Sequence, residues 1–286
     1  MSAPDISVIM PIYNADPWIR QAMDCICLNS HKNLEIICVL DAPTDGSDEV
    51  IKGYAKTDSR IIVVEQKENK GQGHARNVGF KRAKGEWIHF MDSDDLINID
   101  FYKNMLAATK FADVDAVLCS DILHENMQKR VSIFAPMFMS NFGDISKITN
   151  GALSTPWGWM FNRNFLNRIN FQFPEDMIVA EDYIAMGDVI NKANRICTAK
   201  DTTYLYKYRR NSVVTKKSQL KRRKSEFCKG RLFVNELSKQ SGGEPLFEID
   251  KIKSYFRNRL LIKYYINGDK EILFSWRTAG KRVWKI

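Results

Sequence analysis

Apolar and polar positions change along the first 120 residues in a pattern that predicts strands and helices in turn. Short apolar runs with the composition of buried strands occupy residues 6–10, 34–40, 61–65 and 87–91. Helical spacing or helix-opening residues occupy the stretches between them, at 16–29, 48–56 and 71–84. Strands joined by crossover helices indicate an α/β fold, with a mostly parallel, Rossmann-like sheet and helices on its faces.

The remaining pattern predicts fewer strands and a helical end. The expected elements are a helix at 101–111, a strand at 116–120, helices at 164–168 and 181–193, and strands near 196 and at 203–208. From residue 216 the chain has helical character, with a break at 241–245 and a second helix at 249–266. We therefore expect a main unit at 1–215, divided into parts 1–120 and 121–215, and a small, helical C-terminal subdomain at 216–286.

Polar, turn-forming residues follow three of the first four predicted strands. They are Tyr13 and Asn14, the loop 41–45, and the acidic turn 92–95. In parallel sheets ligands bind beyond the carboxyl ends of the strands. These three segments are therefore predicted to form one binding edge.

The acidic turn offers three carboxylates within four residues, from Asp92, Asp94 and Asp95. Charges so close together repel one another unless they share a cation, and Mg²⁺ or Mn²⁺ prefers such oxygen ligands, with substrate phosphates completing the shell. An acidic turn in which Asp95 caps the next helix is the alternative.

Several motifs occur together in one order and spacing. They are Ser7-Val-Ile-Met-Pro11-Ile-Tyr13-Asn14, Leu40-Asp41-Ala-Pro-Thr-Asp45-Gly-Ser47, Asn69-Lys-Gly-Gln-Gly-His-Ala-Arg76-Asn77-Val-Gly79, Gly85-Glu-Trp-Ile-His-Phe-Met-Asp92-Ser93-Asp94-Asp95, Glu181-Asp182, and Tyr206-Lys-Tyr-Arg209-Arg-Asn-Ser212. Together they resemble the inverting family 2 glycosyltransferases, which have the GT-A fold. The resemblance covers nearly all of residues 6–215, although Leu40 and Ala42-Pro43 depart from the family's pattern.

The resemblance implies a UDP-sugar donor, a glycan acceptor and a divalent metal, Mn²⁺ or Mg²⁺. The residues that it implies for nucleotide-sugar binding are Pro11, Tyr13, Asn14, Asp41, Arg76, Asp92, Ser93, Arg209 and Ser212. Tyr13 would stack on the base, Asp41 would accept its N–H, and Asp94 would ligate the metal. Ordinary packing of Tyr13, a surface position for Arg76 and an exposed basic strand end at 207–212 are the alternatives.

Asp182 corresponds to the family's catalytic base, and Glu181 would orient it or touch the acceptor. An acceptor hydroxyl needs such a carboxylate because its own pKa is far above neutral. An acidic pair is also a helix-start signal, since negative charge favours the helix N-terminus. Trp157 is expected to stack on an acceptor sugar, with a place in the core as the alternative. Glucose, galactose and their N-acetylamino forms are all open as donor sugars.

Composition supports a folded globular protein of 286 residues with 44% hydrophobic residues. Its six cysteines have no metal-binding or redox spacing and are expected to be reduced and mostly buried. No apolar run is long enough to cross a bilayer, and the N-terminus lacks the pattern of a signal peptide. A cytoplasmic location is the resulting expectation.

The net charge of +9 divides into two opposite parts. Residues 195–286 carry 24 basic and 8 acidic side chains, a net +16, which leaves residues 1–194 with 19 basic and 26 acidic side chains, a net −7. Basic residues interleaved with Phe227, Leu232 and later aromatics predict peripheral binding to an anionic membrane, at the inner face where a lipid-linked acceptor would lie. A solvated basic helix is the alternative.

Two other functions compete with glycosyl transfer. A nucleic-acid-binding protein would explain the basic end, but no nucleic-acid-binding motif is present and the acidic half would have no role, so no nucleic acid partner is expected. A nucleotidyltransferase also places carboxylates around a metal at strand ends. The Ala75-Arg76-Asn77 helix and the late Glu181-Asp182 pair favour glycosyl transfer.

Overall fold

The computed structural model describes residues 3–110, 113–125, 129–132, 155–207 and 220–240. Its first elements are β1 (Ile6–Ile12), α1 (Ile19–Cys27), β2 (Leu34–Leu40), α2 (Ser47–Thr57), β3 (Ile61–Glu65), α3 (Gln72–Arg82) and β4 (Trp87–Phe90). The later ones are β5 (Leu96–Ile97), α4 (Phe101–Thr109), β6 (Ala116–His124), β7 (Lys129–Ser132), β8 (Trp159–Asn162), α6 (Arg163–Arg168), α7 (Glu181–Lys192), β9 (Ile196–Tyr206) and α8 (Leu220–Gln240).

The strands form one sheet with the order β3-β2-β1-β4-β8-β6-β9-β5, and β7 pairs with β6 at its side. The first four strands are parallel, as the sequence predicts. Beyond β4 the sheet is mixed, because β8 runs antiparallel to both β4 and β6, whereas β6 and β9 are parallel. The expected α/β fold is confirmed, with parallel pairing in the first half of the sheet and mixed pairing in the second.

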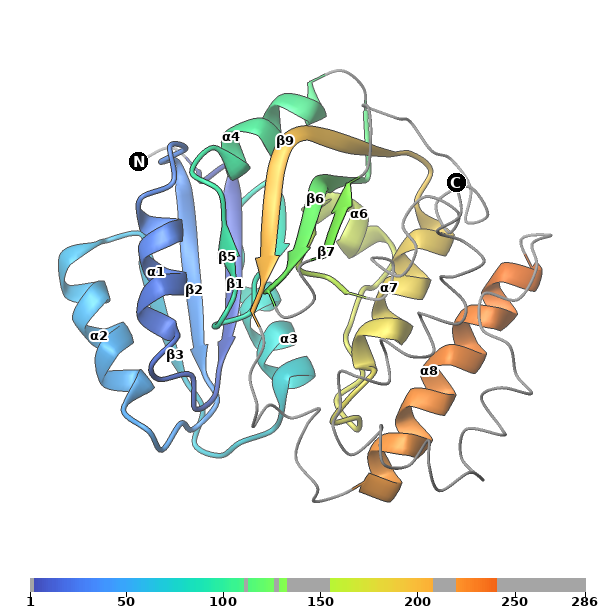
Figure 1. Cartoon of the computed structure of the whole chain (residues 1–286), viewed down its shortest axis with the longest axis horizontal. Coiled ribbons are helices and arrows are strands. Elements are labelled where there is room, and N and C mark those ends of the chain that lie inside the picture. Colours follow the sequence, from blue (N-terminus) through green and yellow to red (C-terminus); the bar gives the residue numbers. More distant parts are fainter. Residues whose placement is uncertain (1–2, 111–112, 126–128, 133–154, 208–219, 241–286) are drawn as a thin grey trace.

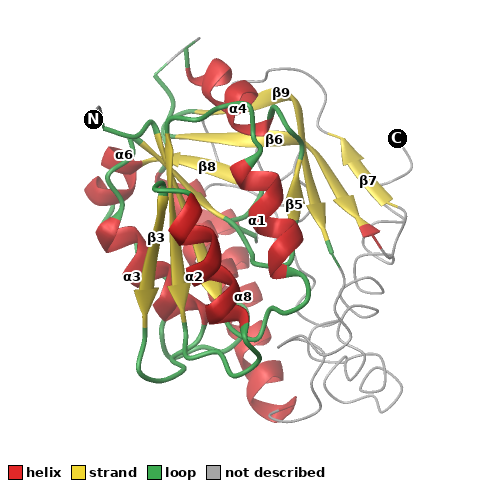
Figure 2. Ribbon diagram, turned by 90° about the vertical axis from the view of Figure 1, so that its left-hand side faces the viewer, coloured by secondary structure: helices red, strands yellow, loops and turns green. Residues whose placement is uncertain are grey.

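Helices cover both faces of this sheet, so the fold has three layers (Figures 1 and 2). Successive β1 residues explain the two cores: Ile9 packs with the cluster that contains α3, α6 and α7, and Val8 and Met10 pack with the cluster that contains α1 and α4. Side chains of a strand alternate between faces, so a strand that is apolar at every position buries both. All seven residues of β2 are buried, and its one charged residue, Glu35, accepts hydrogen bonds from the hydroxyl of Ser7 and the N–H of Lys84.

Helix α8 shares a hydrophobic core with α3, α6 and α7. Its Phe227, Val234 and Leu237 are buried in the cluster that contains α7, and the two helices run side by side (Figure 1). This corrects the expectation that Phe227 belongs to a membrane-facing surface, because its ring packs edge-to-face on Tyr183. The proposed boundary at residue 215 does not separate two cores, and the helix expected at 249–266 lies outside the described residues.

The buried side chain of His89 has a partner for each ring nitrogen. His89, fully buried, has Nε2 2.7 Å from the carbonyl oxygen of Trp157 and Nδ1 2.9 Å from the hydroxyl of Tyr102. Burial lowers the pKa of His89 to about 4, so the ring is neutral; Nε2–H donates to the carbonyl and Nδ1 accepts from the hydroxyl. The six cysteines are free, and three of them, Cys38, Cys119 and Cys197, are buried, whereas the sequence predicts that most are. Burial raises the pKa of Cys25 to about 12.

Candidate functional site

Three strand ends meet at one edge of the sheet. β1 and β2 are in register at Ile12 and Leu40, and β1 and β4 at Ile9 and Phe90. The residues that follow these strands therefore begin close together. The three polar segments therefore lie at one edge of the sheet, as the sequence predicts.

The turn after β1 is tied to the loop after β2. Asn14 has a left-handed backbone (φ 49°), and its Oδ1 accepts the N–H of Thr44 at 2.8 Å. Pro11 lies within β1, and Tyr13 is exposed. A ring held beside a fixed loop and open to solvent can stack on a planar ligand. The structure thus leaves Tyr13 available for the role that the resemblance implies.

Asp41 is buried, and both of its carboxylate oxygens accept backbone N–H groups. Oδ1 accepts from Lys70 and Oδ2 from Gly71, each at 2.9 Å. Gly71 has φ 90°, a conformation that favours glycine, and it directly precedes α3. Asp41 therefore fixes the turn that opens α3, and a further N–H would have to share an oxygen with these donors.

The acidic turn after β4 divides into buried and accessible carboxylates. Asp95 is fully buried: Oδ2 accepts the hydroxyl of Tyr204 and Oδ1 accepts the N–H of Lys207, both at 2.8 Å. Burial, together with the charges of Asp94 and Asp92, raises the pKa of Asp95 well above its ordinary value. Asp95 thus anchors the turn to β9, and Asp92 and Asp94 remain partly exposed.

These residues suit a cation that is shared with a substrate. Among the described residues, no three His, Cys, Asp or Glu side chains gather as ligands for one metal ion. Mg²⁺ commonly binds one or two protein carboxylates and completes its shell with phosphate oxygens and water. Asp94 and the neighbouring Asp92 offer such a set, whereas Asp95 is committed to Tyr204 and Lys207.

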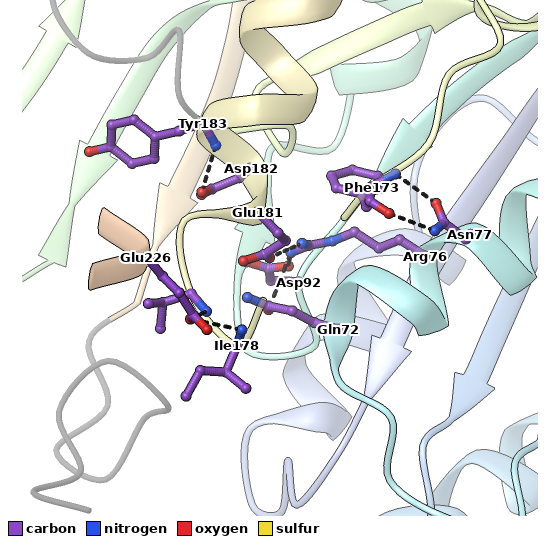
Figure 3. A network of polar contacts seen from close by, with 11 residues as sticks. Gln72, Arg76, Asn77, Asp92, Phe173, Ile178, Glu181, Asp182, Tyr183 and Glu226 are labelled. Carbon is purple, nitrogen blue, oxygen red and sulfur yellow. Dashed lines mark hydrogen bonds and ion pairs between the residues drawn. The ribbon is translucent and has the colours of Figure 1, made fainter. Parts of the chain in front are cut away.

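Arg76 joins the acidic turn to the start of α7 (Figure 3). Its Nη2 donates to Oδ1 of Asp92 and its Nη1 to Oε1 of Glu181, both at 2.8 Å, and its guanidinium lies over the ring of Phe173, 5.1 Å from the centroid. The Arg76 side chain is 3% exposed, so the surface position that the sequence left open is excluded. Although burial opposes its charge, Asp92 and Glu181 raise the pKa of Arg76 and keep it ionised.

Close packing between α3 and the segment before α7 makes this contact reachable. A Cβ on Gly73 would lie 2.6 Å from the carbonyl oxygen of Pro174, so only glycine fits there. Asn77 exchanges two hydrogen bonds with the backbone of Phe173, both 2.9 Å long. The glycine-rich motif thus positions Arg76 by letting the two segments touch.

Glu181 and Asp182 form the first turn of α7. Glu181 is 1% exposed, and its Oε2 has no hydrogen-bond partner. Burial raises the pKa of Glu181, and Arg76 opposes this rise. Burial and then the charge of Glu181 raise the pKa of the half-buried Asp182 well above its ordinary value. A carboxylate of raised pKa is a better proton acceptor near neutral pH.

Trp157 is a core residue, which corrects the expectation of an exposed sugar platform. It is 5% exposed and stacks on Tyr204 and Tyr206, with centroid distances of 4.5 and 5.7 Å. A sugar needs a bare ring face, which this packing does not leave. Ser93 is also buried, and Arg209 and Ser212 lie outside the described residues.

Two residues of the site had no signal in the sequence. They are Tyr204, which holds Asp95, and Glu226 of α8, which accepts backbone N–H groups just before α7. A tyrosine in a strand and a glutamate in a charged helix are ordinary in sequence. Only their partners, far away along the chain, distinguish them.

The sequence matches one protein family over more than half its length. Residues 7–169 match the family described as "Glycosyl transferase family 2". The "Uncharacterized glycosyltransferase EpsJ" of Bacillus subtilis is 29% identical over 219 residues, covering 73% of this chain and 63% of EpsJ. The "Glycosyltransferase GlyG" of Streptococcus pneumoniae is 24% identical over 225 residues, covering 73% of this chain and 72% of GlyG.

Solved structures share the fold. A crystal structure of S. aureus TarS in complex with UDP-GlcNAc matches with a TM-score of 0.69 and 22% identity, covering 80% of this chain and 66% of that one. The mannosyltransferase PcManGT of Pyrobaculum calidifontis, in complex with GDP-Man and Mn²⁺, matches with a TM-score of 0.57 and 22% identity, covering 81% and 64%. At these identities the likeness establishes the GT-A fold.

Proposed function

The chain belongs to glycosyl transferase family 2, and from that premise we propose that it transfers a hexose or N-acetylhexosamine from a UDP-sugar to a hydroxyl of a glycan. The observation that carries the proposal is the joining of two half-sites by Arg76. One contains the accessible carboxylates after β4, and the other contains the carboxylates at the start of α7. A displacement at a sugar carbon needs such groups for the leaving diphosphate and for the acceptor.

The donor half lies at the strand ends. Tyr13 would stack on the base, Asn14 and Asp41 would line its site, and Asp92 would bind the ribose. The TarS neighbour was solved with UDP-GlcNAc, which supports a uridine nucleotide. Arg209 and Ser212 would contact the diphosphate.

Asp94, with Asp92 beside it, would hold Mn²⁺ or Mg²⁺, and the ion would supply Lewis-acid stabilisation of the diphosphate. Arg76 adds positive charge behind Asp92, and it is already neutralised by two carboxylates. The role of Arg76 is therefore to fix Asp92 and Glu181 rather than to replace the metal.

Asp182 would be the base. It takes the proton of the acceptor hydroxyl while that oxygen forms a bond to the anomeric carbon and the bond from that carbon to the diphosphate oxygen breaks with its electron pair. Attack opposite the leaving group inverts the anomeric centre, so an α-linked donor gives a β-linked product. The raised pKa of Asp182 suits this step. The preceding residue, Glu181, forms an ion pair with Arg76.

The basic C-terminal residues would bring the enzyme to an anionic membrane that carries a lipid-linked acceptor. No helix in the described ranges is long and apolar enough to span a bilayer. The test is sedimentation of the full chain with anionic and with neutral vesicles at about 0.15 M salt. Equal sedimentation with both would refute this part of the proposal.

The donor assignment is tested with a panel of UDP-glucose, UDP-galactose, UDP-GlcNAc and GDP-mannose, with Mn²⁺, Mg²⁺ or EDTA. We expect a UDP-sugar to raise the melting temperature and to release UDP, and EDTA to abolish the release. Acceptance of GDP-mannose alone would show that the uridine assignment is wrong. The nucleotidyltransferase alternative is tested in separate incubations with UTP and a sugar phosphate. Release of pyrophosphate there, with no release of UDP from the UDP-sugars, would favour that alternative.

A further inference from the structure

Helix α8 meets the backbone that leads into α7 through one buried carboxylate (Figure 3). Oε2 of Glu226 accepts the N–H groups of Ile178 at 3.0 Å and Val179 at 3.1 Å. Arg222 donates from Nε to Oε1 of Glu226 at 2.7 Å and from Nη2 to the carbonyl oxygen of Asp176 at 2.6 Å. The Glu226 side chain is 6% exposed, so the carboxylate that accepts the two N–H groups is largely shielded from water, whereas the Arg222 side chain is 52% exposed.

The N–H groups of Ile178 and Val179 lie in the segment before α7 and not in the helix itself. Ala180, which follows them and directly precedes the helix, has a left-handed backbone (φ 61°). Buried N–H groups without an acceptor cost free energy, so this segment needs an acceptor from elsewhere. Glu226 supplies it from a helix 47 residues away from Val179 along the chain.

Helices α7 and α8 also contact each other directly beside the first turn of α7. A Cβ on Gly230 would lie 2.9 Å from Cβ of Tyr183 and 3.3 Å from the carbonyl oxygen of Ala180. Phe227 packs edge-to-face on the ring of Tyr183 at a centroid distance of 6.2 Å. The first turn of α7, which carries Asp182, is therefore held from one side by α8.

We propose that Glu226 is a positioning residue for the reaction: by fixing the backbone at 178–179 it sets the direction in which the first turn of α7 presents Asp182 to the acceptor. The inference rests on the proposed function, because it takes Asp182 as the base. A shift of about 1 Å at a catalytic group can lower the rate on the order of 100-fold, so a backbone anchor of this kind acts on catalysis without touching substrate.

Three substitutions separate positioning from general stability. Glu226→Ala leaves both N–H groups without an acceptor. Glu226→Gln keeps an amide oxygen for them but sets its NH₂ against Arg222. Glu236→Ala removes an exposed glutamate from the same helix and is the matched control.

The measurements are the rate of UDP release from UDP-GlcNAc with Mn²⁺ and a panel of methyl glycosides, the affinity for UDP, and the melting temperature, with rates taken well below it. We expect Glu226→Ala to lower kcat about 10- to 100-fold with UDP affinity changed less than about twofold. Glu226→Gln should recover most of kcat, and Glu236→Ala should match the wild type.

A wild-type rate in folded Glu226→Ala would overturn the positioning role, as would a loss of UDP affinity in proportion to the rate. Failure of the proposed function has a different pattern. In that case the wild type would release UDP no faster than an Asp182→Asn variant with every acceptor offered.

Discussion

Replacing Arg76 by Met should destabilise the protein strongly at neutral pH. The substitution keeps an unbranched side chain in the buried space but removes the two ion pairs of the guanidinium, to Asp92 and to Glu181, and its longer hydrogen bond to Gln72. It leaves the Glu181 carboxylate 1% exposed with no cation beside it. Breaking a buried pair by removing one partner is costly because the other charge stays buried.

The structure sets the expected magnitude. Asp92 is 23% exposed and can regain water, so its lost hydrogen bond is discounted, whereas Glu181 has no such access. We therefore expect the free energy of unfolding to fall by about 3–5 kcal/mol. The contact of the guanidinium with the Phe173 ring, lost at the same time, accounts for a smaller part of about 1 kcal/mol.

The pH dependence identifies the cause. Burial already raises the pKa of Glu181, and without Arg76 it should rise further. A carboxyl group whose pKa is higher in the folded state destabilises the fold as pH rises from its unfolded value, about 4.3, through its folded value. The gap between Arg76→Met and wild type should therefore be widest near pH 7 and narrow toward pH 4.

The assay is urea unfolding followed by tryptophan fluorescence between pH 4.5 and 8. Glu181→Gln in the Arg76→Met background removes the stranded charge and should recover about 2 kcal/mol or more. If Arg76→Met lowers the free energy of unfolding by less than about 1 kcal/mol, or by an amount that does not change with pH, the buried ion pair between Arg76 and Glu181 does not stabilise the fold as argued. The same follows if the double variant is no more stable than Arg76→Met alone.

Two further substitutions test the packing and the acidic turn. Gly73→Ala should lower the free energy of unfolding in urea by about 1–3 kcal/mol, because its Cβ would meet the backbone oxygen of Pro174. The control Gly53→Ala, whose Cβ would have nothing within 4 Å, should be neutral or stabilise the protein by up to about 1 kcal/mol. Equal effects of the two substitutions would contradict the close approach of α3 to Pro174. Tyr204→Phe leaves Oδ2 of the buried Asp95 without its hydroxyl donor, so the free energy of unfolding should fall by about 1–3 kcal/mol. The same substitution should raise the Mn²⁺ concentration needed for half-maximal UDP release. An unchanged Mn²⁺ requirement would show that Asp95 does not hold the acidic turn in place for the metal.

The first half of the fold could be predicted because its signals are local. β2 and β3 begin and end where their apolar runs do, and the three polar strand ends meet as expected. Register between distant strands has no such signal. The antiparallel insertion of β8 between β4 and β6 depends on pairing with residues 71–75 positions away in β4 and 41–45 positions away in β6, which composition does not encode.

The site was predictable in its residues and not in their partners. The motifs identify Arg76, Asp92 and Glu181, but the sequence alone does not distinguish an exposed arginine from one that pairs with two carboxylates. The aromatic signal of Trp157 was equally ambiguous, since stacking on tyrosines and stacking on a sugar use the same ring face. The burial of Arg76 and of Trp157 distinguishes the two alternatives in each case. Burial depends on contacts between segments that are distant in the sequence.

The most direct test of the central claim compares Asp182→Asn with the wild type. UDP release from the accepted UDP-sugar, with Mn²⁺ and acceptor, is measured together with the affinity for UDP. If Asp182 is the base, Asn should lower kcat by about 10²- to 10⁴-fold and leave UDP affinity within about twofold. A variant that keeps more than about a tenth of the wild-type rate would contradict the account, because general-base catalysis contributes more than that.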